Sequence, residues 1–406
     1  MAAVFSLDLC DDYTTVCAEG DEEVSILPTV ICRDKNKEKW HIGEEAYGLT
    51  LSGKAVPTDK LVTMLKKDGR STMGGRTYSA AELCAQFIVS ILDKRLEGGK
   101  LSDVGLLYIC LEVPDKGLFD SLREALTGLG LKEQSLRFMS HAEAFIHYIL
   151  SKDKELYNNT VAVFDLSEGD LRYNEFRMIR GLSRMTAICD STRLEEAFRI
   201  DILNSDSGRK LADHILLECA KKLMDRKIFS SVFLTGKGFE DMEFAGEFKE
   251  FICRRRRVLY DDGIFARGAL MAAEKLLSGE EETVLMLCDT RLACEISMEV
   301  SVEGRQNRLI LAPPGTSWYG YTAHAEFIPQ GQEHVDIDIA PVMKNGSKLR
   351  ETVELKGFPK RPDRCTRVSM DMELLGGDKL KLCLSDLGFG DFFQKSGHEI
   401  TTEIEF

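Results

Sequence analysis

The segment VAVFDL (Val161–Leu166) repeats, near the middle of the chain, the apolar-Asp-Leu ending of VFSLDL (Val4–Leu9). Both segments are short apolar runs of the kind that form buried strands. A second strand candidate follows each of them, TVCAE (Thr15–Glu19) after the first and NEFRMI (Asn174–Ile179) after the second. A strand pair that occurs twice predicts two lobes of similar fold.

Helix patterns alternate with strand patterns between the two repeats. Ser79 and Glu82 have capping-box spacing, as do Ser140 and Glu143, and apolar residues at helical spacing follow each pair. VGLLYICLEV (Val104–Val113) has the length and composition of a buried central strand.

The same alternation continues after the second repeat. Ser207 is expected to cap a helix, SVFLTG (Ser231–Gly236) to form a strand, and Asp261–Leu277 to form a last helix. The sequence therefore predicts two α/β lobes that face each other across a cleft.

The last third of the chain alternates with a period of two. HVDIDI (His334–Ile339), RVSMDMEL (Arg367–Leu374) and KLKLCL (Lys379–Leu384) are typical strands, and the pairs 345–346 (Asn-Gly) and 376–377 (Gly-Gly) are typical turns. This pattern predicts an all-β domain, most simply a sandwich.

These patterns divide the chain into an α/β domain over residues 1–278 and a β-sandwich over residues 290–406, joined by a linker over residues 279–289. A short apolar linker can dock on a neighbouring domain, so this one is expected to couple the two. Its apolar residues are Val284, Leu285, Met286 and Leu287.

The composition of the chain argues against a nucleic-acid partner and a membrane partner. The 406 residues include 53 Lys and Arg against 67 Asp and Glu, so the basic excess that binds a phosphate backbone is missing and no nucleic-acid partner is expected. No apolar run approaches the ~18 residues of a spanning helix, and Met1–Asp8 has no signal-peptide pattern, so no membrane partner is expected. None of the twelve cysteines forms a Cys-x-x-Cys pair, which favours a reducing, cytoplasmic location.

Six motifs in a fixed order resemble the 70-kilodalton heat-shock chaperone family, which shares the actin-like ATPase fold. The resemblance implies two phosphate loops, an adenosine loop, a closing helix, an interdomain linker and a peptide-binding sandwich. In chain order, the motifs are DLCDDYTTV (Asp8–Val16), FDLSEGD (Phe164–Asp170), FLTGKGF (Phe233–Phe239), ARGALMAA (Ala266–Ala273), VLMLCD (Val284–Asp289) and ELKGFPKRPDRC (Glu354–Cys365).

The first implied phosphate loop departs from the family pattern. Glycines let a backbone approach phosphates closely and aim its N–H groups at them. Here Cys10 stands in place of the glycine, and Asp11 and Asp12 in place of two threonines, while Asp8 matches a metal-associated aspartate of the family.

The second implied phosphate loop departs in the same way. Asp165 matches the second metal-associated aspartate, but Ser167 and Glu168 replace glycines and Asp170 replaces a threonine, so that Gly169 alone survives. If the loops face each other, six carboxylates crowd the cleft, and each pair with a phosphate charge at ~4 Å costs about 4 kcal/mol at an effective dielectric constant of about 20. The six are Asp8, Asp11, Asp12, Asp165, Glu168 and Asp170.

Other expected functional residues are changed as well. Ser140, a sufficient helix cap, aligns with the family's catalytic glutamate, and Lys60 is either a counterpart of its catalytic lysine or a surface lysine. Gly236 and Gly238 of the adenosine loop remain, but Phe239 stands where the family has a base-stacking arginine.

Several side chains have two interpretations. Asp8 and Asp165 either end strands and cap turns or hold a metal ion or other ligand. Asp11 and Asp12 are interpreted first as a solvated hairpin turn and second as a cation site. His141 has no partners that the sequence identifies, so a core or surface role is the default.

We therefore expect a chaperone-related scaffold or protein-binding module that does not hydrolyse nucleotide, needs no cofactor and binds a protein or an extended peptide through its sandwich. The chain stops at Phe406, soon after the sandwich strands, so the family's helical lid is expected to be missing.

Three alternatives remain open at the level of sequence. The first is an active chaperone-like ATPase that uses ATP and Mg²⁺ through divergent loops, with lobe closure relayed to the sandwich. The second is a cation-binding protein that uses the acidic cleft. An actin-like assembly protein is the third.

Overall fold

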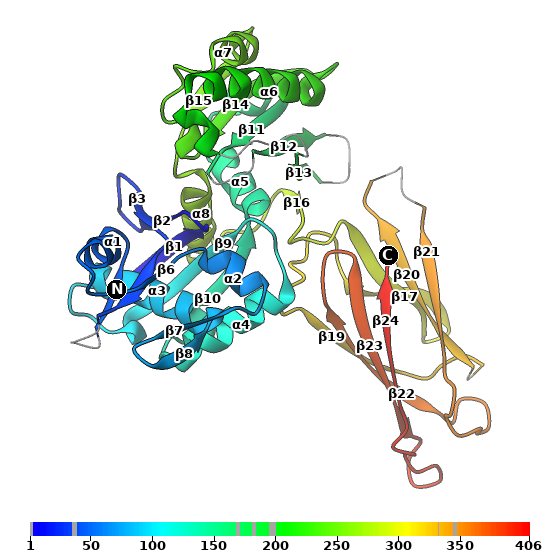
Figure 1. Cartoon of the computed structure of the whole chain (residues 1–406). Helices are drawn as coiled ribbons and strands as arrows, with labels where there is room; N and C mark the ends of the chain where they lie inside the picture. The colour runs from blue at the N-terminus through cyan, green and yellow to red at the C-terminus, as the bar shows by residue number, and fades with distance from the viewer. Residues whose placement is uncertain are drawn as a thin grey trace. The chain divides into compact units, whose positions relative to one another are not determined.

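A computed structural model describes residues 3–34, 39–167, 171–180, 184–194, 200–331, 333–343 and 347–406 (Figure 1). The chain forms two compact units, Met1–Val284 and Leu285–Phe406, and each is described by itself. The division falls inside the segment that the sequence marks as a linker.

The first lobe of the first unit is built on a five-stranded sheet with the order β10-β9-β1-β2-β3 (Figure 1). β1 (Ala3–Leu9) pairs with β2 (Tyr13–Ala18) in the antiparallel direction and with β9 (Val104–Leu111) in the parallel direction. β3 (Ser25–Pro28) and β10 (Leu136–Ser140) complete the sheet.

The strands that the first unit contributes to the sheet of the second lobe repeat this arrangement, with the order β15-β14-β11-β12-β13. β11 (Thr160–Asp165) pairs antiparallel with β12 (Arg172–Ile179) and parallel with β14 (Phe229–Thr235). β13 (Thr186–Arg193) and β15 (Arg257–Tyr260) lie at the two ends of this order. Because strand order and direction agree in both sheets, the predicted duplication is confirmed, and the unit has the two-lobed actin-like fold.

Helices and small strands surround the two sheets. The helices are α1 (Glu44–Leu51), α2 (Leu61–Lys66), α3 (Ala80–Arg95), α4 (Lys116–Gly128), α5 (His141–Leu150), α6 (Asp206–Met224), α7 (Gly246–Cys253) and α8 (Ile264–Ser278). The small strands are β4 (Ile31–Arg33), β5 (Trp40–Ile42), β6 (Pro57–Thr58), β7 (Arg70–Met73) and β8 (Arg76–Ser79).

The predicted helix caps are confirmed in two of three places. Ser79 and Glu82 form a complete capping box at the start of α3, and Ser140 caps α5. The cap predicted at Ser207 is wrong, because Ser205 has the extended backbone of a cap and its hydroxyl accepts from a backbone N–H of α6.

Helices α5 and α8 pack closely together. A Cβ atom at Gly268 of α8 would lie 1.9 Å from the carbonyl oxygen of Ala144 in α5, so only glycine permits this approach. The Ser6 hydroxyl of β1 also donates to the Ala266 carbonyl at 2.7 Å. These contacts place the first residues of α5 and α8 next to the end of β1.

The second unit is all-β and consists chiefly of two four-stranded antiparallel sheets. One has the order β18-β17-β20-β21 and the other β19-β22-β23-β24. Alternate residues of β23 are buried, as the period-two pattern predicts for a sandwich. The strands are β17 (Cys294–Val302), β18 (Arg305–Ala312), β19 (Thr322–Phe327), β20 (His334–Pro341), β21 (Leu349–Glu354), β22 (Arg367–Leu374), β23 (Lys379–Gly388) and β24 (Glu399–Glu405).

Two sequence expectations concern connecting segments. The apolar part of the predicted linker forms a short strand, β16 (Leu285–Leu287), at the start of the second unit. The turn predicted at residues 345–346 lies outside the described residues. Within the described part of the chain, no helix has the length and apolar character needed to cross a bilayer.

Candidate functional site

The two retained aspartates occupy equivalent positions in the two lobes. Asp8 lies near the end of β1, opposite Cys110 of the parallel strand β9, and Asp165 ends β11, opposite Thr235 of the parallel strand β14. Asp8 is 7% exposed and Asp165 is 1% exposed. Duplicated topology therefore brings one buried carboxylate from each lobe to the same region.

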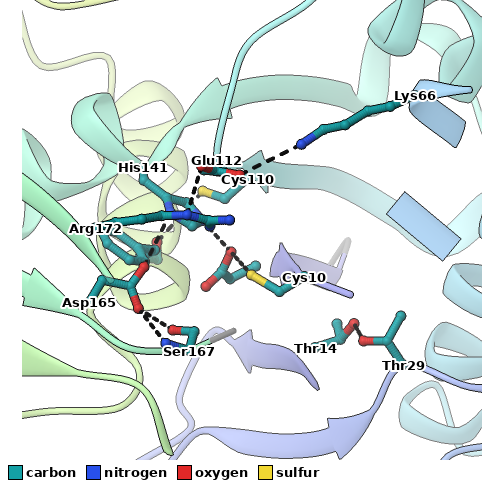
Figure 2. Close-up of polar contacts among 12 residues, drawn as sticks. Cys10, Thr14, Thr29, Lys66, Cys110, Glu112, His141, Asp165, Ser167 and Arg172 are labelled. Carbon is teal, nitrogen blue, oxygen red and sulfur yellow. Dashed lines mark hydrogen bonds and ion pairs between the residues drawn. The ribbon is translucent and has the colours of Figure 1, made fainter. Parts of the chain in front are cut away.

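The side chain of His141 lies close to both carboxylates, and Figure 2 shows it next to Asp165. Its Nε2 atom is 2.7 Å from Asp8 Oδ1, and its Nδ1 atom is 3.9 Å from Asp165 Oδ2. The ring stacks on Phe265 at the start of α8, with 3.9 Å between ring centroids and planes 6° apart. His141 is the first residue of α5, so the Ser140 cap and the helix direction orient it.

The charges around His141 favour its protonated form. Burial lowers the pKa of His141, but the hydrogen-bonded Asp8 carboxylate and the Asp165 carboxylate outweigh burial, and the net pKa is raised. Burial raises the pKa of Asp165, with partial opposition from His141 and Arg172.

In the first loop, the carboxylates of Asp11 and Asp12 contact residues at and next to the start of α2. Asp11, 9% exposed, accepts hydrogen bonds from the Thr63 backbone N–H at 2.9 Å and from the Thr63 hydroxyl. Asp12 forms an ion pair with Lys60, whose side chain is about half exposed. The solvated turn expected here is wrong for Asp11, because the free N–H groups at the start of a helix attract an anion.

In the second loop, Ser167 donates hydrogen bonds to Asp165, two residues before it. The Ser167 backbone N–H donates to Asp165 Oδ1 at 2.9 Å, and the Ser167 hydroxyl donates to the same oxygen. Asp165 Oδ2 has no hydrogen-bond partner among the described residues. Glu168, Gly169 and Asp170 lie outside the described residues.

In the described part of the site, neighbouring groups offset part of the charge of the carboxylates that are expected to crowd the cleft. Asp8, Asp11 and Asp12 each have a basic side chain or N–H donor beside them. The repulsion estimated from sequence ignored these partners, which a linear motif does not reveal.

Basic side chains also enter from both lobes. Arg172 at the start of β12 forms an ion pair with Glu112, which follows β9, with 2.7 Å between Nε and Oε1. Lys66 Nζ lies 3.6 Å from the other carboxylate oxygen of Glu112 (Figure 2). Cys10, Glu112 and Arg172 help to line a cavity of about 20 Å³, which has room for about one water molecule.

The two glycines of the implied adenosine loop have a packing role. A Cβ atom at Gly236 (φ +91°) would lie 2.4 Å from the Ser167 nitrogen, and one at Gly238 would lie 2.3 Å from the Leu166 side chain. The Gly238 N–H donates to the Leu166 carbonyl at 3.0 Å. These glycines let the two loops of the second lobe lie against each other.

The aromatic residue of that loop is part of the core. Phe239 is 1% exposed and stacks on Phe248, with 6.1 Å between ring centroids. Its neighbour Lys237 instead reaches the other lobe, where Nζ lies 3.8 Å from the ring centroid of Tyr13. The Phe239 ring is therefore buried in the second lobe.

Sequence reasoning missed His141, Arg172 and Glu112. The one available signal is the position of His141 directly after Ser140, a residue that the chaperone resemblance aligns with a catalytic glutamate. The partners of His141 come from strands that lie 133 residues before it and 24 residues after it in the sequence, so no local pattern pairs them.

Each of the two units matches the model of a protein family. Residues 12–289 match the model described as Family of unknown function (DUF5716) C-terminal, and residues 291–406 match the Domain of unknown function (DUF8552). Comparison with curated proteins found no match.

Solved structures similar to this chain include two non-polymerising proteins. One is a non-polymerising MamK mutant bound to AMPPNP, with 12% identity over 67% of this chain and 98% of that chain, at a TM-score of 0.43. The other is a non-polymerisable quadruple mutant of pCBH ParM, with 11% identity over 67% of this chain and 99% of that chain, at a TM-score of 0.45.

Proposed function

Since the chain belongs to the family described as Family of unknown function (DUF5716) C-terminal and has the two-lobed actin-like fold, we propose that it is a chaperone-related, protein-binding scaffold that does not hydrolyse nucleotide. The fold by itself does not decide activity, so the proposal depends on the residues between the lobes.

The position of His141 carries the proposal. Asp8 and Asp165 resemble the aspartates that serve the metal of a bound nucleotide in the heat-shock chaperone family. Here the His141 ring is hydrogen-bonded to Asp8 at 2.7 Å and lies 3.9 Å from Asp165. Mg²⁺ takes oxygen ligands in a strict octahedron, so this pair with its imidazole does not fit it.

The adenosine loop supports the same conclusion. Phe239 is buried against Phe248 and has no free face for a base. Leu166 and Ser167 lie directly against Gly236 and Gly238, where a nucleotide would need open backbone.

Protein binding is assigned to the β-sandwich. Strand β18 (Arg305–Ala312) is at the end of its sheet order, and residues 305–310 are all exposed. Edge strands with open N–H and C=O groups can pair with an extended peptide segment. A peptide that adds to β18 is the partner we propose.

Thermal unfolding with and without ATP and Mg²⁺ tests the proposal. A ligand that binds only the folded state raises the melting temperature, and a 100-fold excess over Kd is worth about 2.7 kcal/mol. We expect no shift at millimolar ATP and Mg²⁺. A shift of several degrees, together with phosphate release, would instead establish the alternative of an active ATPase.

A further inference from the structure

A thiol stands beside the Asp8–His141 pair. Cys10 Sγ lies 3.6 Å from Asp8 Oδ1, and one ligand atom from each of Asp8, Cys10 and His141 lies within 4.8 Å of the others (Figure 2). The three residues are 7%, 6% and 2% exposed, respectively. Cys10 occupies the place of a phosphate-loop glycine in the motif, so the departure from that motif supplies a new ligand.

The donor set selects a class of metal. A thiolate, an imidazole and a carboxylate are the ligands of zinc sites, whereas Mg²⁺ and Ca²⁺ take oxygen ligands. Tetrahedral zinc with bonds of ~2.0 to 2.3 Å separates its ligand atoms by about 3.3 to 3.7 Å. The observed separations of 2.7 Å (Asp8 to His141) and 3.6 Å (Asp8 to Cys10) need only small side-chain shifts.

A second observation points to the same ion. A metal-binding histidine usually donates its other ring N–H to a carboxylate. Asp165 is 1% exposed, and its Oδ2 atom has no hydrogen-bond partner among the described residues. That oxygen lies 3.9 Å from His141 Nδ1, on the side of the ring away from Asp8.

A cavity of about 20 Å³, with room for about one water molecule, adjoins one of the three side chains, because Cys10 helps to line it whereas Asp8 and His141 do not. Zinc sites with three protein ligands complete their tetrahedron with water.

We propose that Asp8 Oδ1, Cys10 Sγ and His141 Nε2 bind one Zn²⁺ ion, with water as fourth ligand. Asp165 is a positioning residue that accepts the His141 Nδ1–H. The inference deepens the proposed function, because it rests on the same site having exchanged a magnesium-nucleotide ligand set for a zinc ligand set.

Cobalt substitution tests the site directly. The metal-free full-length chain is titrated with Co²⁺, and a near-ultraviolet thiolate-to-cobalt band with the visible bands of tetrahedral cobalt is expected at one equivalent. Added Zn²⁺ should remove the bands by displacement. A wild-type chain that shows no thiolate-to-cobalt band overturns the proposal.

Matched cysteine variants locate the ligand. Cys10→Ser should abolish the thiolate band, whereas Cys17→Ser, at another buried cysteine of the same lobe, should retain it. Asp8→Asn provides a second ligand variant if Cys10→Ser unfolds, which circular dichroism of the metal-free proteins detects. A band that persists in both Cys10→Ser and Asp8→Asn places the metal elsewhere and overturns the proposal.

The Asp165→Asn variant tests the positioning role. Loss of a carboxylate behind a metal-binding histidine lowers affinity by about 10- to 100-fold. The cobalt spectrum should keep its thiolate band at saturation, because the ligands are unchanged. All titrations omit nucleotide, so a negative result in them overturns the zinc site and leaves the outcome of the ATP experiment unaffected.

Discussion

Arg361 and Asp386 form a buried, bidentate ion pair in the β-sandwich, with their side chains 5% and 0% exposed. The Arg361 Nη atoms donate to the two Asp386 oxygens at 2.6 and 2.7 Å. The backbone N–H groups of Gly388 and Ser396 donate to the same carboxylate at 3.0 and 2.9 Å. One buried carboxylate thus joins the end of β23 to the loop before β24.

This pair predicts acid sensitivity of the second unit. The hydrogen bonds from Arg361 hold the pKa of Asp386 well below its usual range. The stabilisation is therefore fully present above the unfolded-state pKa of about 4 and is lost as pH falls below it. Asp386→Asn should lower the free energy of unfolding by about 3 kcal/mol at pH 7. Urea denaturation at pH 7 and pH 3 should show a smaller gap between variant and wild type at the lower pH, and an equal gap would contradict this account.

Removal of the His141 ring should expose the mutual repulsion of two buried carboxylates. We expect His141→Ala to lower the free energy of unfolding by about 3 kcal/mol, because Asp8 loses its charged partner. Added MgCl2 should recover part of this loss, since a cation can then enter between Asp8 and Asp165. The control is His147→Ala, at a buried histidine on the same helix, and its free energy of unfolding should not change with MgCl2. If MgCl2 stabilises both variants, the explanation by repulsion between Asp8 and Asp165 is wrong.

The adenosine-loop glycine should be indispensable for folding without any nucleotide. Gly236→Ala combines a φ of +91° with a Cβ 2.4 Å from the Ser167 nitrogen, so a loss of more than about 2 kcal/mol is expected. Gly279→Ala is the matched control, since it has a φ of +67° and no atom within 4 Å of the added Cβ. Denaturant unfolding of the two variants should separate steric clash from backbone strain, and equal losses would refute the packing role.

The contact between α5 and α8 offers a similar comparison. Gly268→Ala would place a Cβ 1.9 Å from the Ala144 carbonyl oxygen and should cost about 3 kcal/mol or more. Gly128→Ala in α4 meets nothing within 4 Å and should stabilise the protein by up to about 1 kcal/mol through helix propensity. Opposite signs in thermal unfolding are expected, whereas two stabilised variants would mean that the helices can separate without loss.

Local signals in the sequence were sufficient for most elements. Period-two alternation identified β20, β22 and β23, and the capping box at Ser79 and Glu82 identified the start of α3, because these patterns depend on neighbours within one element. The cap of α6 was placed two residues late, at Ser207 in place of Ser205, since two serines offer the same local chemistry.

The candidate site was predictable only in part. Asp8 and Asp165 stand out in the sequence because they end repeated strands, whereas the partners of Asp11 and Asp12 depend on where α2 lies. Their pairing with Thr63 and Lys60 removes much of the charge that the linear motif suggests.

By itself, the sequence determined the duplicated α/β pattern, the all-β second unit and the replacement of glycines in both implied phosphate loops. Each of these features depends on residues that are close together in the sequence. Only the tertiary structure decided that His141 lies between two aspartates from different lobes, next to the thiol of Cys10. These contacts join residues that lie 133 and 24 positions apart in the sequence, so they depend on how strands and helices pack, which no local pattern reveals.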